Sequence, residues 1–136
     1  MTIALKIIVK QNNLIMEWKY FKIEEFDDPN VEGSALENMD FDFITILNKI
    51  RHESGVPMRI TSGFRTQETN DALEHSVPNS SHLKGIAVDV ACDNGIDRQK
   101  IVSSAIKHKI RRIGIGKTFL HLDIDPDKNP SIWLYS

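Results

Sequence analysis

The sequence predicts an α+β domain in which helices pack on a mostly antiparallel sheet. Three observations lead to this prediction. Apolar residues recur at helical spacing in the first half of the chain, short alternating apolar segments dominate the second half, and the linkers between the last segments are too short for crossovers. A chain of 136 residues fits one such domain, whose core needs no disulfide or metal to hold it.

Two helices are predicted in the middle of the chain. Asp40 can cap a helix in which apolar residues recur every three or four positions, and Gly55 can end it. Thr66 can cap a second, shorter helix that extends to about His75. The polar segment after it, with Pro, Asn and Ser residues, is typical of a loop.

The second half of the chain contains one more predicted helix and most of the strands. The helix covers 96–109, with Asp93 or Asp97 near its start. Short linkers between the last three strands favour antiparallel pairing among them. The segments predicted as strands cover 58–62, 86–91, 113–116, 119–124 and 132–135.

Composition and charge exclude several classes of protein. A net charge of −2 gives no field to attract nucleic acid or anionic lipid, so neither is an expected partner. The single cysteine, Cys92, excludes an internal disulfide and a cysteine-rich zinc site. The apolar run in 1–15 is too short for a signal peptide or a membrane span. We therefore expect a monomer made in the cytoplasm, with an N-terminal arm or extension over 1–19 and a single domain over 20–136.

Polar residues that can bind metals lie in or beside the apolar segments. His82 ends the polar loop, Asp89 lies in the segment IAVDVA, and His121 and Asp123 lie in FLHLDI. Burying a carboxylate in a strand costs several kcal/mol unless it is paired or bound to a metal. Because side chains alternate along a strand, His121 and Asp123 project from one face. If the two strands are neighbours, these groups converge.

The types of these residues fit a catalytic zinc site. Zinc binds His nitrogen and Asp oxygen, and catalytic sites keep three protein ligands and one position for water. His82, Asp89 and His121 supply that number. Each residue taken alone is better explained as a surface or core residue, and a buried polar network without metal remains an alternative for Asp89 and His121.

Three segments resemble the zinc peptidases of peptidoglycan that form the D-Ala-D-Ala carboxypeptidase family, which includes phage endolysins and shares its fold with the hedgehog signalling domain. The resembling segments are SGFRTQETN, SSHLKGIAVDV and FLHLDID. The most specific feature is the pattern S-x-H-x-x-G-x-A-x-D, in which His82 and Asp89 are seven residues apart. The runs KYFKIEEF and ITSGFR are similar to the small phage-type branch. The resemblance extends from about Tyr20 to the C-terminus and implies a hedgehog-like fold.

The resemblance also implies roles for individual residues. His82, Asp89 and His121 match the three zinc ligands. Arg65 matches an arginine that helps to hold the substrate's carbonyl or carboxylate, and a guanidinium suits that task, although a structural ion pair is the alternative. Ser81, or its neighbour, would support the metal loop or bind substrate through hydrogen bonds.

One position departs from the family pattern. Many relatives have Asp or Glu three residues before the third zinc ligand, where it acts as general base, and this chain has Thr118 there. Asp123 is the nearest carboxylate. It is the candidate general base, or else the partner that orients His121, as the H-x-D pattern of the small phage-type branch suggests.

The expected activity is hydrolysis of a peptide bond in peptidoglycan stem peptides, by a carboxypeptidase or an endopeptidase. The sequence does not choose between the two. Thr118 favours an alternative in which the chain binds zinc and cell-wall peptide without hydrolysing it. An enzyme without an export signal would reach the wall after lysis, through a holin-type pore or from a virion, which suits a phage or prophage origin.

Overall fold

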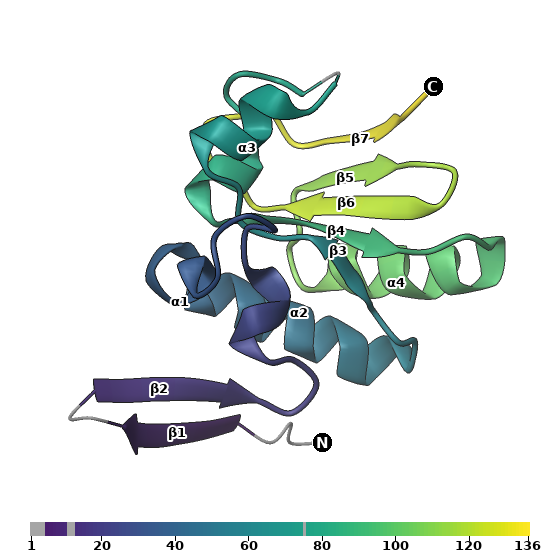
Figure 1. The fold of residues 1–136 in the computed structure, drawn as a ribbon. Coiled ribbons are helices and arrows are strands. Elements are labelled where there is room, and N and C mark those ends of the chain that lie inside the picture. The colour runs from purple at the N-terminus through teal and green to yellow at the C-terminus, as the bar shows by residue number, and fades with distance from the viewer. Residues whose placement is uncertain (1–4, 11–12, 75) are drawn as a thin grey trace.

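The computed structural model describes residues 5–10, 13–74 and 76–136, and its strands form two sheets (Figure 1). The larger sheet has five strands in the order β3-β4-β6-β5-β7, and the smaller sheet is a hairpin of β1 and β2. The helices and this mixed sheet confirm the predicted α+β class. The strands are β1 (Leu5–Lys10), β2 (Asn13–Trp18), β3 (Ile60–Ser62), β4 (Ala87–Ala91), β5 (Arg112–Ile115), β6 (Phe119–Asp123) and β7 (Ser131–Leu134).

Two helices begin at the residues that the sequence predicts. Asp40 caps α2 (Phe41–Ser54) by accepting a hydrogen bond from the backbone N–H of Phe43, and Gly55 ends this helix in a left-handed conformation. Thr66 caps α3 (Gln67–Ala72) in the same way. The predicted end of α3 at His75 lies outside the described residues, and the helix ends three residues earlier.

The last long helix starts where the sequence predicts, with Asp97 in its first turn. Helix α4 (Gly95–Lys107) is capped by Asn94, whose side-chain oxygen accepts from the backbone N–H of Asp97 at 2.9 Å. Three short helices were not predicted, since none is long enough to show a helical period. They are η1 (Ile23–Phe26), α1 (Ser34–Asn38) and η2 (Ser81–Lys84).

The last strand corrects the prediction of antiparallel pairing at the end of the chain. Both edges of β6 are occupied, because β4 and β5 pair with it in antiparallel fashion. Strand β7 therefore adds to the free edge of β5, and it runs parallel to that strand. Strand β6 ends opposite Arg112, the first residue of β5, and the segment 124–130 passes that end of β5, so that β7 starts beside Arg112 on the other edge.

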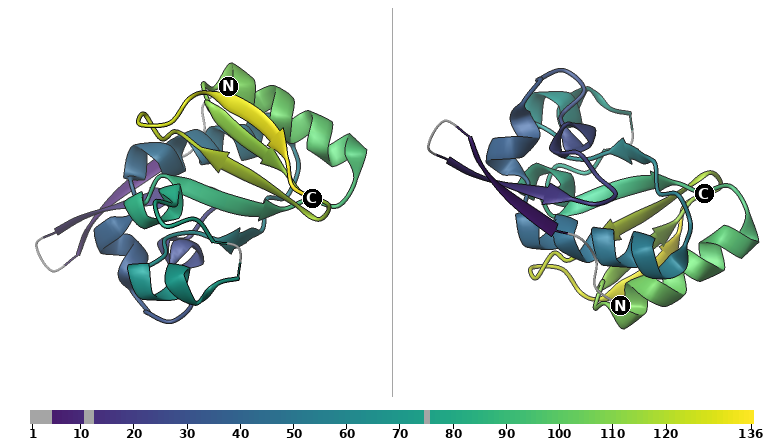
Figure 2. Two further views of the ribbon diagram at one scale, coloured as in Figure 1. Left: turned by 90° about the horizontal axis from the view of Figure 1, so that it is seen from above. Right: turned by 90° about the horizontal axis from the view of Figure 1, so that it is seen from below.

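The sheet separates an apolar face from a polar one. Val88 and Val90 of β4 and Leu120 and Leu122 of β6 are fully buried in the core. Helices α2 and α4 pack against each other and lie together in the lower half of Figure 1, with α3 at the upper end. Figure 2 shows the same arrangement from above and below. The residues that alternate with these apolar ones project from the opposite face.

The N-terminal hairpin lies below α2 and apart from the larger sheet (Figure 1). Its last residue, Trp18, is only 6% exposed, donates its indole N–H to Thr45 and packs edge-on against Phe41. The predicted extension over 1–19 thus contacts the domain through Trp18, and the boundary at residue 20 stays a prediction. Among the described residues, no helix is long and apolar enough to cross a membrane.

Candidate metal centre

His82 is held by a short helix and a tight turn. It lies in η2, and Gly85 ends this helix with φ +71°. A Cβ atom at Gly85 would lie 1.9 Å from the backbone oxygen of Asn38, so the turn requires glycine. The Nδ1 atom of His82 is 2.8 Å from the backbone oxygen of Gly63. Because a carbonyl only accepts, Nδ1 carries a proton, and a neutral ring has its lone pair on Nε2.

Asp89 and His121 lie opposite each other on neighbouring strands. They are direct partners in the pairing of β4 with β6, and they project from the polar face. The Nε2 atom of His121 is 2.6 Å from Oδ2 of Asp123. That carboxylate also accepts from Arg112 and from the backbone N–H of Asp125, so it is ionised and takes the Nε2 proton as an acceptor. The lone pair of a neutral His121 ring is therefore on Nδ1.

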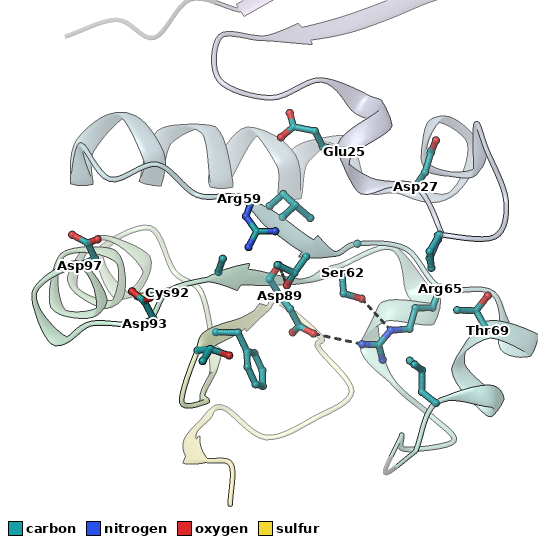
Figure 3. A pocket seen from close by; sticks show the side chains of 18 residues that line it. Glu25, Asp27, Arg59, Ser62, Arg65, Thr69, Asp89, Cys92, Asp93 and Asp97 are labelled. Atoms are coloured by element: carbon teal, nitrogen blue, oxygen red, sulfur yellow. Dashed lines mark hydrogen bonds and ion pairs between the residues drawn. The ribbon is translucent and has the colours of Figure 1, made fainter.

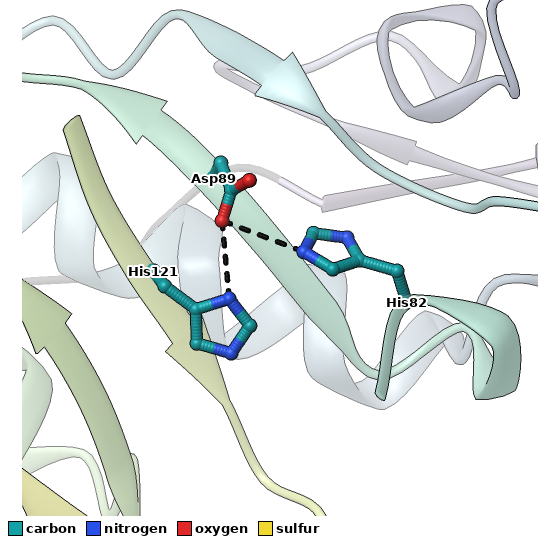
Figure 4. A group of neighbouring side chains, drawn as sticks. All are labelled: His82, Asp89 and His121. Atoms are coloured by element: carbon teal, nitrogen blue, oxygen red, sulfur yellow. Dashed lines mark hydrogen bonds and ion pairs between the residues drawn. The ribbon is translucent and has the colours of Figure 1, made fainter. Parts of the chain in front are cut away.

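Both lone pairs point at one carboxylate oxygen. Oδ1 of Asp89 is 3.4 Å from Nε2 of His82 and 3.0 Å from Nδ1 of His121 (Figure 4). The three possible ligand atoms all lie within 4.8 Å of one another. Three acceptors that face one another repel, unless protons on the rings or a shared cation lie between them. The structure thus brings together the three predicted ligands in an arrangement that calls for positive charge.

The donor set fits a divalent zinc ion. Zinc binds two nitrogens and one oxygen at about 2.0–2.2 Å in tetrahedral geometry, which sets ligand atoms roughly 3.4 Å apart. The two ring-to-carboxylate distances of 3.4 and 3.0 Å agree with that spacing. Magnesium and calcium, in contrast, prefer sites made of oxygen ligands. We refer to His82, Asp89 and His121 as the His-Asp-His group.

In the metal-free protein, a proton on a histidine ring relieves the repulsion among the three acceptors. Burial opposes the charged form of His121, but hydrogen bonds to Asp123 and Asp89 outweigh burial and raise the pKa of its imidazole. Burial would raise the pKa of Asp89, yet hydrogen bonds from His121 and His82 hold it well below its usual range. Without metal, the group therefore favours an ionised carboxylate beside a protonated ring.

Arg65 lies at the edge of the His-Asp-His group. Its Nε donates to Ser62 at 3.1 Å, one terminal nitrogen contacts Asn70 at 3.3 Å, and the other contacts Oδ2 of Asp89 at 3.5 Å. The side chain is 15% exposed and lines the cavity beside the His-Asp-His group. Burial lowers the pKa of this guanidinium, and the charge of Asp89 acts against that shift. The ion pair considered as an alternative for Arg65 is therefore present.

Ser81 belongs to a second polar cluster, which η2 contacts through its first and last residues. Its hydroxyl donates to Oδ2 of Asp125 at 2.7 Å and is itself 3.1 Å from Nζ of Lys128. Lys84 donates to both oxygens of Asp125. We call Ser81, Lys84, Asp125 and Lys128 the Asp125 cluster. Ser81 is 2% exposed, so it supports the loop that carries His82, and direct contact with substrate stays a prediction.

The His-Asp-His group opens into a cavity of about 530 Å³. Trp133 and Tyr135, on and just after β7, form one wall, and the ring of Trp133 is 5.5 Å from that of His121. Arg112 stacks on Trp133 at 4.7 Å while it holds Asp123. Sequence reasoning missed these residues, although the alternation of aromatic side chains in WLY could have indicated a face of β7.

The remaining sequence candidates lie elsewhere or have other partners. Thr118, at the position of the expected base, does not line the cavity of the His-Asp-His group. His52 contacts the hydroxyl of Tyr20, and His108 lies 3.4 Å from Glu53, so both have structural partners. Among the described residues that line the cavity, the carboxylates are Glu74, Asp89 and Asp123, and Glu74 was also missed.

Comparison with known proteins assigns the family. A search of curated proteins found no match. The sequence profile of the peptidase M15 family, in contrast, matches residues 15–125. This range contains every residue of the His-Asp-His group together with Arg65 and Asp123. Because the match covers most of the chain, and the His-Asp-His group could hold a metal as these metal-dependent peptidases require, the chain belongs to the peptidase M15 family.

Proposed function

We propose that this chain is a zinc-dependent peptidase that hydrolyses a peptide bond in the stem peptides of peptidoglycan. The observation that carries the proposal is the convergence of two imidazole lone pairs and one carboxylate oxygen beside an open cavity. The family supports a hydrolase that acts on peptides. Peptidoglycan as the substrate rests on the resemblance of the three sequence segments described above.

The residues of the centre have separable tasks. A zinc ion held by His82, Asp89 and His121 would polarise the peptide carbonyl and lower the pKa of a water molecule. Arg65 fixes Oδ2 of Asp89 and turns a cationic face to the cavity, where it would bind a carbonyl or developing oxyanion. The aromatic wall of Trp133 and Tyr135 would exclude water from one side of the substrate.

Asp123 is better suited to positioning than to proton transfer. Its side chain has no exposed surface, and both oxygens already have partners in His121, Arg112 and the backbone of Asp125. Of the two roles considered for Asp123, we therefore propose that it orients His121. Glu74 is the exposed carboxylate at the cavity, and we propose it as the candidate general base.

The burial of Asp123 also gives weight to the second candidate function. If neither Asp123 nor Glu74 can accept a proton from water, the chain would bind metal and stem peptide without cleaving it. Thr118 at the expected position of the base favours this binding module. The two functions make the same prediction for metal binding and opposite predictions for turnover.

Digestion of purified peptidoglycan sacculi tests the proposal. New amino groups or free alanine should appear with the zinc-loaded protein, disappear with a chelator and return with added zinc. Mass spectrometry of the fragments then identifies the bond. One zinc per chain without turnover on any stem peptide would support the binding module instead. Zinc far below one per chain, with activity retained in His121→Ala, would support the metal-free polar network.

A further inference from the structure

The cavity of the His-Asp-His group adjoins a second one, with which it shares lining residues. The second cavity has a volume of about 720 Å³ and lies along the edge strand β3 and the start of α4 (Figure 3). Ile60, Ala91 and Thr118 are among the residues that line it. Four residues line both cavities and mark the junction: Arg65, Leu73, Asp89 and Phe119. We call the smaller cavity the aromatic arm and the larger one the β3 arm.

The His-Asp-His group lies beside this junction and not at a closed end. All three of its residues line the aromatic arm, and Asp89 also lines the β3 arm. Because the two cavities adjoin at shared residues, the β3 arm offers space for a peptide beyond Asp89. A pocket for the last residue of a chain would instead be closed beyond the reacting bond, with a cation at its end.

Arg65 is the cation at the junction, and its contacts argue against a dedicated carboxylate site. Each of its three guanidinium nitrogens contacts a protein acceptor, on Ser62, Asn70 and Asp89. Its charge is matched by Asp89 in an ion pair of 3.5 Å. A second carboxylate, from the end of a substrate, would have to compete with Asp89. A neutral carbonyl can accept one of the remaining N–H groups without displacing that ion pair.

We propose that this peptidase cleaves internal peptide bonds, with the substrate chain crossing the junction and occupying both arms. The inference rests on the proposed function and specifies its substrate class as a peptide that extends on both sides of the cleaved bond. In the reaction, the C–N bond breaks, the oxygen of water enters the new carboxylate, and the amine product receives the proton. No terminal carboxylate takes part in recognition.

A pair of stem peptides that differ only at the C-terminus tests this inference. One ends in a free carboxylate and the other in an amide, and both extend several residues beyond the cleaved bond. An enzyme that binds both arms should cleave the two with kcat/KM within about threefold, since removing one exposed charge changes little. A preference for the free acid of about a hundredfold or more, with release of the last residue, would overturn the inference and leave the proposed function standing. Cleavage of neither peptide by the zinc-loaded protein would contradict the proposed function as well.

A variant of the β3 arm supplies a second, independent test. Ala91 follows Asp89 by two residues on the same strand face and lines the β3 arm alone. Ala91→Phe should narrow this arm and lower kcat/KM about tenfold or more for a long peptide, but less than about twofold for the shortest peptide cleaved. Ser103→Phe adds the same ring at an exposed position on α4 and is the matched control. Equal losses for long and short peptides in a folded Ala91→Phe protein would contradict occupation of the β3 arm.

Discussion

Two polar clusters share η2, which contributes His82 to one and Ser81 and Lys84 to the other, and they satisfy a carboxylate in different ways. In the Asp125 cluster, the fully buried carboxylate of Asp125 receives hydrogen bonds from Ser81 and from the ammonium of Lys84. In the His-Asp-His group, two ring lone pairs face the carboxylate of Asp89. Arg65 reaches only the outer oxygen, Oδ2. One cluster thus contains its own cation, while the other lacks one at the point where its acceptors meet.

The difference shows which buried acid indicates a function. A carboxylate that the chain neutralises with lysine, hydroxyl and backbone donors is a structural feature, and burial alone does not make it a site. Acceptors that converge without a matching donor are unfavourable in the empty protein and are satisfied by a ligand. The comparison predicts that zinc affects one cluster only.

Removing a ligand should have the largest effect. Asp89→Asn keeps the size of the side chain but removes the charge that balances the cation, so metal binding and turnover should both be lost. Lys84→Met, which removes the nearer of the two cations in the Asp125 cluster, should keep one zinc per chain. Metal content by mass spectrometry and turnover on sacculi measure both. The comparison fails if Lys84→Met loses zinc or Asp89→Asn retains it.

Asp123→Asn should have the next largest effect on activity. The amide weakens the hold on the Nε2 proton of His121, and loss of such a partner typically costs about 10–100-fold in metal affinity or activity. Asp127→Asn changes an exposed carboxylate in the segment that follows β6, and it should change neither metal affinity nor activity. Zinc affinity from competition with a chelator, measured beside kcat, separates the roles. A large loss of kcat at unchanged zinc affinity would indicate that Asp123 is the base.

Gly85→Ala should disturb both clusters, because η2 carries residues of each. A left-handed alanine costs about 1–2 kcal/mol, and the close approach to Asn38 adds to this cost. Gly55→Ala is the control, since Gly55 has a similar φ of +69° but nothing within 4 Å of its Cβ position. Thermal unfolding should show a clearly larger loss for Gly85→Ala. Equal losses of stability in the two variants would mean that the backbone of Asn38 moves away from the new Cβ atom at no cost in free energy.

Ser81→Ala should destabilise the protein by about 0.5–1.5 kcal/mol, because it removes one of the two donors to Oδ2 of Asp125 and leaves that oxygen with Lys84 alone. Ser103→Ala on α4, where the serine is exposed, should change the free energy of unfolding by less than about 0.5 kcal/mol. Denaturant titration measures both variants. If Ser81 instead bound substrate alone, KM would rise and the stability would not change.

The smallest effect concerns pH and the metal-free protein. The pKa of His121 is raised above its ordinary value of 6.5, so its contribution to stability is present below that value and is lost as pH rises through the raised pKa. The pKa of Asp125 is lowered, so its contribution is constant in this range and is lost only in acid, below its ordinary 3.8. The melting temperature should therefore fall between neutral and alkaline pH in the metal-free wild type and not in His121→Asn.

The sequence predicted those features that depend on local patterns. The caps Asp40 and Thr66 and the strands around Asp89 and His121 follow from spacing and alternation. The role of His82, in a loop, came from the family resemblance. The parallel pairing of β7 did not follow from such patterns, because it depends on which sheet edge is already occupied. The alternation in WLY indicates an aromatic face of β7, but the position of that face beside His121 depends on the same pairing.

Other parts of the site depend on partners that are distant in sequence. The hold of Arg112 on Asp123 joins two strands, and the tie between Ser81 and Asp125 spans more than forty residues. No periodicity encodes such pairs. The burial of Asp123, which separates a positioning role from a base, likewise appears only after the sheet is assembled.

The wall of the aromatic arm is built on an edge strand that only β5 holds in the sheet. Additions or deletions at the C-terminal end should therefore lower catalytic activity more than they lower stability. An affinity tag fused after Ser136 adds bulk beside Tyr135 at the mouth of the cavity, and trimming the last residues removes part of its lining. Protein made for kinetic work is better tagged at the other end, where the hairpin lies apart from the sheet.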